Sequence, residues 1–281
     1  MSLYVPPQPE PVAVGSRTVI PLVDAAGHVL PPERLFPDLP DAELTRLLTA
    51  EGTSEPMAVT GFAILGADTT ILVDTCLGGG KQGRKGPFPG FTSRWMDTLA
   101  EAGIAPDAVD VVVNTHLHHD HVGWNTTDEL KPTFPNARYL LAEAEYEHLG
   151  TGRLRHADRV RECVTPVAEA GLLHLISGVH EIDDGVRLLP APGHTPGHLV
   201  AEITDSGRTA IIAGDLIHHP LQLLRPDVSS SLCEDPALAA ESRHRVLNDL
   251  ADRTGVLLAA HLTRSGTIHR DGAGFSLRDL P

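Results

Sequence analysis

Four histidines and one aspartate lie within six consecutive positions of the chain, in the stretch HLHHDH at residues 116–121. Imidazole and carboxylate groups are the ligands of divalent metal ions of intermediate softness, and two such clusters within a few ångströms would hold two ions. The stretch directly follows the apolar run VVV, so it begins where a buried strand is expected to end. The pair His116 and His118 can then face one side while Asp120 and His121 face another. A solvated, histidine-rich loop is the alternative interpretation of this run alone.

A pair of metal ions in such a site would support hydrolysis. Metal binding lowers the pKa of a bound water to about 7, which creates a nucleophile at neutral pH, and one ion can polarise the carbonyl or phosphoryl oxygen under attack. The donor set fits Zn²⁺ best, but mixed nitrogen and oxygen sites also accept iron, manganese or cobalt. We therefore expect two divalent metal ions as cofactors, and the sequence does not choose among these metals.

Two halves of the chain show a similar order of expected elements. In the first half, a hairpin is expected to end at Asp74, and a helix and a buried strand then lead into the histidine run. In the second half, LVAEITDSGRTAIIAGD is a hairpin that ends at Asp215, a helix begins at the cap residue Asp235, and the strand GVLLAAH ends at His261. Such halves bury their apolar faces best when two sheets pack together with helices outside. The pattern predicts an α+β chain with a four-layer α/β/β/α sandwich.

The N-terminal part of the chain differs in composition from the rest. Residues 1–55 contain the proline-rich segments YVPPQPEP and LPPERLFPDLP, with one short helix expected from Asp41 to Thr49. We expect these residues to form an arm that packs on the core. Residues 56–281 are then expected to form a single domain, which is a common size for a layered fold.

The charge of the chain limits its partners. The 281 residues include 22 Lys and Arg against 37 Asp and Glu, which gives a formal net charge of −15. A field of this sign repels the phosphate backbone, and no basic cluster reverses it locally, so we expect no nucleic-acid partner. The expected partner is a small-molecule substrate, and a homodimer is left open.

Localisation and redox state also follow from the sequence. The N-terminus MSLYVPPQPEPVAV lacks the basic start and the apolar run of a signal peptide, and no run of about 18 apolar residues occurs that would cross a membrane. A cytoplasmic protein without a membrane partner is expected. The cysteines Cys76, Cys163 and Cys233 lie far apart without CxxC spacing, which is typical of free thiols. Neither a disulfide nor a thiolate zinc site is predicted.

Four motifs in order resemble those of the metallo-β-lactamase-fold hydrolase superfamily: THLHHDHVGWN, PAPGHTPGHL, AGDLIHH and the histidine that ends GVLLAAH. The resemblance extends from about Met57 to His261 and implies that residues 56–281 are the hydrolase domain. It implies a nucleophilic hydroxide that bridges two metal ions. The resemblance implies a first metal site at His116, His118 and His194, a second at Asp120, His121 and His261, and a bridging ligand at Asp215.

Within the superfamily, HVGWN and GDLIHHPLQL resemble the branch of methyl parathion hydrolase and the quorum-quenching lactonases. These lactonases typically have a tyrosine three residues after the bridging aspartate, where this chain has His218; the organophosphate hydrolase also has a histidine there. His218 is expected to act as a general acid toward the leaving oxygen, with packing beside the site as the alternative. Asp120 and His218 are thus the expected catalytic residues, with Asp120 also a metal ligand.

The expected function is hydrolysis of a small, mainly apolar ester, lactone or related acyl or phosphoryl compound. The alternatives are an organophosphate triester hydrolase, a thioesterase, or a non-catalytic protein that binds metal or senses a ligand. Asp74 and His198 are expected to orient ligating histidines through the other ring nitrogen, whereas His119 should point away. A hydrophobic substrate lobe is predicted from nearby aromatic residues: Phe88, Phe91, Trp95, Trp124 and Phe134.

Overall fold

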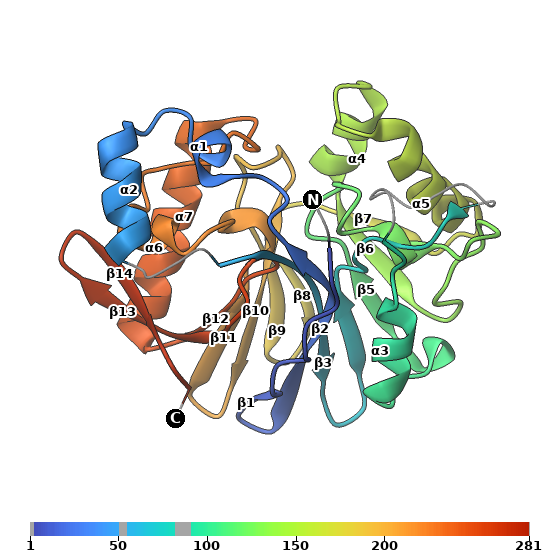
Figure 1. Ribbon diagram of the computed structural model, residues 1–281. Coiled ribbons are helices and arrows are strands. Elements are labelled where there is room, and N and C mark those ends of the chain that lie inside the picture. Colours follow the sequence, from blue (N-terminus) through green and yellow to red (C-terminus); the bar gives the residue numbers. More distant parts are fainter. Residues whose placement is uncertain (1–2, 51–54, 82–90, 281) are drawn as a thin grey trace.

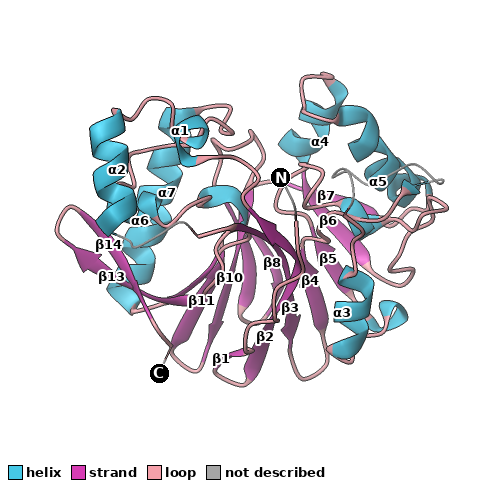
Figure 2. Ribbon diagram, in the orientation of Figure 1, coloured by secondary structure: helices cyan, strands magenta, loops and turns pink. Residues whose placement is uncertain are grey.

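The computed structural model describes residues 3–50, 55–81 and 91–280 of the chain. Within these residues, two seven-stranded sheets pack face to face and helices cover their outer faces (Figures 1 and 2). The predicted four-layer α/β/β/α sandwich is confirmed. No helix of the described part is long and apolar enough to cross a bilayer.

The first sheet follows the order of its strands along the chain. Neighbours from β1 to β4 are antiparallel, whereas β4 to β7 run parallel. Parallel neighbours need crossovers, which here contain α3 (Trp95–Glu101) after β4, and α4 (Glu143–Gly150) and α5 (Ala157–Glu169) after β6. The strands are β1 (Val12–Val14), β2 (Arg17–Gly27), β3 (Met57–Leu65), β4 (Thr70–Val73), β5 (Val111–Val113), β6 (Arg138–Ala142) and β7 (Leu173–Ile176).

The second sheet has one parallel pair, β11 and β12, joined through α7 (Pro236–Arg253). As predicted, Asp235 caps this helix, because its carboxylate accepts a hydrogen bond from the backbone N–H of Leu238 at 3.0 Å. The short helix α6 (Leu221–Leu224) precedes it. The strands are β8 (His180–Asp183), β9 (Val186–Pro190), β10 (Leu199–Asp205), β11 (Arg208–Ile212), β12 (Val256–Leu258), β13 (Gly266–Asp271) and β14 (Gly274–Arg278).

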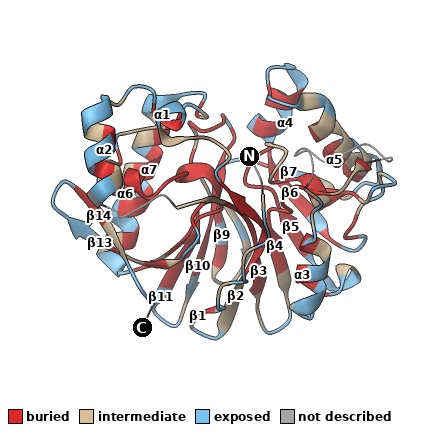
Figure 3. Cartoon of the chain, viewed as in Figure 1, coloured by how far each residue is buried: buried red, intermediate tan, exposed pale blue. Residues whose placement is uncertain are grey.

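The core explains why β5 is apolar at every position. Val111 and Val113 pack between the two sheets, whereas Val112 packs with Trp95 and Leu99 of α3 on the opposite face. Both faces of this strand are therefore buried, and all three of its residues are classed as buried, the class coloured red in Figure 3. A parallel strand covered on both faces has no polar position until it reaches the edge of the sheet. The histidine run begins at that edge.

The described part of residues 1–55 does not form one arm. Residues 12–27 form β1 and β2, and β2 pairs with β3 from Thr18–Leu65 to Gly27–Met57, so it belongs to the first sheet. Its Pro21 is tolerated because β1 pairs only with residues 17–19, which leaves β2 uncovered on that side at the proline. The following helices lie outside the sheets against α6 (Figure 1): α1 (Pro32–Leu35) and α2 (Asp41–Ala50).

Candidate metal centre

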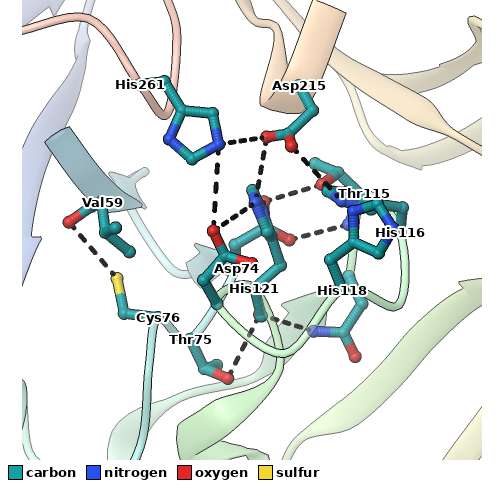
Figure 4. Close-up of polar contacts among 12 residues, drawn as sticks. Val59, Asp74, Thr75, Cys76, Thr115, His116, His118, His121, Asp215 and His261 are labelled. Atoms are coloured by element: carbon teal, nitrogen blue, oxygen red, sulfur yellow. Dashed lines mark hydrogen bonds and ion pairs between the residues drawn. The ribbon is translucent and has the colours of Figure 1, made fainter. Parts of the chain in front are cut away.

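The predicted donors meet at one edge of the sandwich because several strands end there. Strand β5 leads into His116, and β12 into His261. The turn after β11 contributes Asp215, and the loop between β9 and β10 contributes His194. Figure 4 shows part of this convergence, with Asp215 and His261 facing the histidine run from the second sheet. Residues far apart in the sequence therefore share one site.

A first cluster of donors surrounds His194. Its Nε2 lies 2.9 Å from Nδ1 of His118, 3.2 Å from Nε2 of His116 and 3.1 Å from Oδ2 of Asp215. One ligand atom from each of these four residues lies within 4.8 Å of the others. The first three-histidine set of the sequence analysis is therefore brought together, with Asp215 beside it.

A second cluster lies on the other side of Asp215. Its Oδ1 is 2.9 Å from Nε2 of His121 and 3.0 Å from Nε2 of His261. Asp120 completes the cluster, with Oδ2 at 3.8 Å from His121 and 3.9 Å from His261. One carboxylate thus offers Oδ2 to the first cluster and Oδ1 to the second, which is the arrangement expected of a bridging ligand.

The donor atoms converge without satisfying one another. Nε2 of His121, Oδ1 of Asp215 and Nε2 of His218 are buried and make no hydrogen bond within the described residues. His121 and Asp215 approach to 2.9 Å, so their distance allows a bond but their alignment does not. An unsatisfied buried polar group costs about 1–3 kcal/mol. Divalent cations would satisfy such lone pairs, so the residues fit a dinuclear metal site.

The protonation states of the metal-free donors differ between residues. Burial, together with neighbouring imidazoles, holds the pKa of His116 and His118 well below the usual value, so these rings are neutral. Burial alone would raise the pKa of Asp215, but His121 and His261 hold it well below its usual range. Despite their burial, Asp215 raises the pKa of His121 and His261, and raises that of His194 to about 9. A metal ion would therefore displace protons from these three rings, whereas the first two rings and the carboxylate are already in the forms that bind metal.

Hydrogen-bond partners outside the donor clusters hold the histidine rings of the second cluster in place. Asp74 accepts hydrogen bonds from the backbone N–H and hydroxyl of Thr115 at 2.8 and 2.7 Å, and its Oδ2 lies 2.7 Å from Nδ1 of His121. Nδ1 of His261 lies 2.7 Å from the carbonyl oxygen of Ala58. Each contact holds one ring nitrogen so that Nε2 faces Asp215. Asp74 therefore makes the contact that the sequence suggested for it.

His198 does not orient a ligating histidine, as was expected, because both of its ring nitrogens contact the backbone. Its Nδ1 lies 3.1 Å from the carbonyl oxygen of Ala191, and its Nε2 accepts a hydrogen bond from the backbone N–H of Asp215 at 3.0 Å. The neighbouring Gly214 has a φ of +50°, and a Cβ there would lie 2.8 Å from the His198 ring. Glycine and histidine together place the Asp215 backbone. His119 lies beside His156, with ring centroids 4.7 Å apart, and belongs to neither cluster.

The prediction of a hydrophobic substrate lobe is wrong for two of its five aromatic residues. Trp95 and Phe134 are fully buried under the first sheet, with ring centroids 6.4 Å apart, and the Trp95 indole donates to the carbonyl oxygen of Leu22. Trp124 and Phe91 pack at the margin of the same core. Phe88 lies outside the described residues. Trp95 lies on α3, where it packs with Leu99 one turn further along the helix. Phe134 was assigned to the lobe only because it is near the histidine run in sequence.

Two contacts behind the histidines were not predicted. Sγ of Cys233 lies 3.8 Å from Nδ1 of His194, and Oγ of Ser230 lies 3.3 Å from Nδ1 of His218. The backbone N–H of Glu234 donates to the carbonyl oxygen of His194 at 3.0 Å, which fixes this segment behind the site. Nothing in the sequence distinguishes Cys233 from the other two cysteines, because the contact depends on tertiary packing. All three thiols are free, as predicted. Cys233 nevertheless lies with His194 and His218 in a group whose ligand atoms are within 4.8 Å of one another, which the prediction of no thiolate metal site did not anticipate.

Removing the Cys233 thiol should weaken metal binding. Outer contacts to ligating histidines contribute about 10- to 100-fold in metal affinity, so we expect a loss in this range for Cys233→Ala. Chelator competition measures it. Cys163→Ala is the matched control, because that buried thiol contacts the carbonyl oxygen of Gly123 and none of the donors. Equal metal affinity in the two variants would show that the thiol does not hold the His194 ring.

Comparisons with known proteins agree with this fold. The family model described as the metallo-beta-lactamase superfamily matches residues 55–261, so the chain belongs to this superfamily. An N-acyl homoserine lactonase of Bacillus thuringiensis is 30% identical over 151 residues, which cover 49% of this chain and 55% of the lactonase. Metallo-beta-lactamase domain-containing protein 1 of Mus musculus is 28% identical over 186 residues, covering 63% and 55%. The chain thus spans about half the length of these curated relatives.

Two solved structures share nearly the whole fold. AidC, a dizinc quorum-quenching lactonase in complex with a product, superposes with a TM-score of 0.83 at 21% identity over 97% of both chains. The hydrolase AbOPH superposes with a TM-score of 0.82 at 20% identity over 96% of this chain and 97% of its own. At such identities the likeness shows the fold alone, over a larger share of the chain than the family match to residues 55–261.

Proposed function

We propose that the chain is a dinuclear metal-dependent hydrolase of a small, mainly apolar substrate with an ester-type bond. The observation that carries this proposal is Asp215, which offers one carboxylate oxygen to each of two donor clusters. The relatives named as lactonases support an acyl ester or lactone. Phosphotriesters and thioesters are the alternative substrates, because the same chemistry serves them.

The proposal gives each cluster a metal. His116, His118 and His194 would hold the first ion, Asp120, His121 and His261 the second, and Asp215 would contact both. Two bound ions would supply electrophilic activation of the carbonyl or phosphoryl oxygen and a water nucleophile at neutral pH, with Zn²⁺ the best fit to these donors. The chain itself contributes rigid positioning, since Asp74 and His198 hold the ligands from behind.

His218 is proposed to give a proton to the leaving oxygen. Its Nε2 lies 3.3 Å from Oδ2 of Asp215, and its backbone N–H donates to Oε1 of Gln222 at 2.8 Å. Burial lowers the pKa of His218 to about 4, so the ring is neutral at neutral pH. A neutral ring can donate a hydrogen bond from Nε2 if Nδ1 accepts from the hydroxyl of Ser230. To protonate the leaving oxygen, it would first take up the proton that the attacking water loses.

The test combines metal content with turnover. Protein purified without chelator and reloaded with Zn²⁺ should contain two equivalents by elemental analysis, and should hydrolyse members of a panel of chromogenic esters, lactones, thioesters and phosphotriesters. Activity should fall when a chelator removes the metal and return on reloading. Two equivalents without turnover of any panel member would favour a non-catalytic metal-binding protein. A maximum of one equivalent would contradict the second cluster.

A further inference from the structure

Helix α4 places a buried carboxylate between the two loops that carry the first donor cluster. Oε1 of Glu145 accepts a hydrogen bond from the backbone N–H of Leu117 at 3.0 Å, and Oε2 accepts one from the backbone N–H of Gly197 at 2.9 Å. Leu117 is the residue between the two histidine donors of the HLH motif, and Gly197 follows His194 in the PGHTPG turn. One side chain of α4 therefore joins both loops.

The carboxylate of Glu145 is fully buried, and it is not in any of the groups of described residues that could hold a metal ion. A buried carboxylate is unfavourable unless hydrogen-bond donors compensate it. Burial raises the pKa of Glu145, and the N–H groups of Leu117 and Gly197 oppose that rise. Because both oxygens accept from the backbone, the side chain is placed to hold loops and not to react with a substrate.

The contact between α4 and the His194 loop depends on glycine at position 197. A Cβ on Gly197 would lie 2.5 Å from the backbone nitrogen of Glu145 and 2.7 Å from its Cβ. Glycine allows such a close approach of two backbone segments, whereas any side chain would push the loop away from the helix. The chain therefore has a glycine and a buried glutamate on opposite sides of one contact.

The same helix holds the His194 segment at a second point. One turn after Glu145, Nε2 of His148 lies 2.7 Å from Oε1 of Glu234. The backbone N–H of Glu234 in turn donates to the carbonyl oxygen of His194 at 3.0 Å. Among the described residues, neither Glu145 nor His148 makes a hydrogen bond or ion pair with a donor of the second cluster. The contacts of α4 therefore favour the first cluster.

We infer that Glu145 is a positioning residue for the first metal ion, because it holds together the two loops that carry His116, His118 and His194. The inference rests on the dinuclear site of the proposed function. Outer contacts to metal ligands contribute about 10- to 100-fold in metal affinity. Glu145 acts on the backbone beside the ligands and not on their rings, so an effect near the lower end of this range is expected, and only for the first ion.

The experiment removes one of the two hydrogen bonds without changing the volume of the side chain. In Glu145→Gln the amide offers one oxygen, and its NH2 group faces the other backbone N–H. We expect the affinity for one Zn²⁺ ion to fall about tenfold and the affinity for the other to stay as in wild type. Competition with a chromogenic chelator measures both affinities. The visible spectrum of the Co²⁺-loaded protein shows whether the ligand geometry of one ion has changed.

Asp120→Ala identifies the affected ion, because Asp120 is a donor of the second cluster and not of the first. Each single variant should weaken a different ion, and the double variant with Glu145→Gln should weaken both. Gly197→Ala pushes the loop away from the same contact and should weaken the same ion as Glu145→Gln. It also provides the test if Glu145→Gln does not fold.

Glu147→Gln is the matched control, because Glu147 is exposed on the same helix. The control should keep both metal affinities and the Tm of the metal-free protein. Equal weakening of both ions in Glu145→Gln, or weakening of the ion that Asp120→Ala affects, would overturn the inference. Unchanged affinities in both Glu145→Gln and Gly197→Ala would also overturn it.

Metal affinity separates the role of Glu145 from the hydrolase proposal, because its measurement needs no turnover. Selective weakening of the first ion, in a protein that hydrolyses no member of the substrate panel, would support the role of Glu145 and reject the hydrolase. Hydrolysis by wild type, with both affinities unchanged in the Glu145→Gln and Gly197→Ala variants, would do the reverse. A wild-type protein that binds no metal and hydrolyses nothing would reject both.

Discussion

Replacing Asp215 by alanine should remove both metal binding and hydrolysis. The carboxylate is buried among four imidazoles, which approach its two oxygens to 3.3 Å or less: His121 and His261 at Oδ1, His194 and His218 at Oδ2. Without it, two cations would face each other with less compensating charge. Loss of an outer contact to a metal ligand lowers metal affinity or activity about 10- to 100-fold. Loss of a ligand shared by two ions should therefore lower turnover roughly 10³-fold or more.

The measurement is metal content and kcat/KM on the same protein samples. Asp215→Asn tests charge separately from shape, because the amide keeps the volume but offers one neutral oxygen. It should also lose metal. Asp271→Ala is the control, because Asp271 is exposed at the end of β13 and belongs to neither cluster. If Asp215→Ala retained two equivalents of metal and most of its activity, the bridging role would be wrong.

The resemblance to the superfamily motifs predicted which residues form the donor clusters, and the histidine run, Asp215 and His261 also follow apolar strands. Strands such as β5 are buried on both faces, so their polar residues gather where the strand ends. The short motifs around His116 and Asp215 contain both the end of the strand and the donors that follow it. The two clusters meet because β4, β5, β11 and β12 end at one edge, and their order along the chain already indicated two similar halves.

Contacts that depend on packing between distant segments could not be predicted. Cys233 reaches His194 only because the turn before α7 pairs with the loop after β9. Leu30 and His218 line one cavity because β2 joins the first sheet and delivers the next residues to the site. The proline content of residues 1–55 concealed this strand. Composition is averaged over a segment, whereas the strand depends on the local run from Arg17 to Gly27.

His218→Ala should separate the proton donor from the metal site. If Nε2 of His218 gives a proton to the leaving oxygen, the variant should keep two metal equivalents and lose about 10²- to 10⁴-fold in turnover, the usual range for a general acid. The structure makes this test sharper, because Nε2 of His218 lies within 4.8 Å of donor atoms of Asp215 and His261 and could itself contact a metal. Metal content therefore has to be measured with the rates.

The dependence on the leaving group decides between these roles. Nitrophenolate needs almost no proton as it departs, so the variant should hydrolyse nitrophenyl esters at close to the wild-type rate and alkyl esters or lactones far more slowly. Ser230→Ala should change the rates in the same direction but less, because it removes only the contact at Nδ1 of His218. Rates for wild type and both variants are compared across leaving groups of graded pKa. A uniform loss with one metal equivalent missing would make His218 a ligand, and no loss at all would leave it a packing residue.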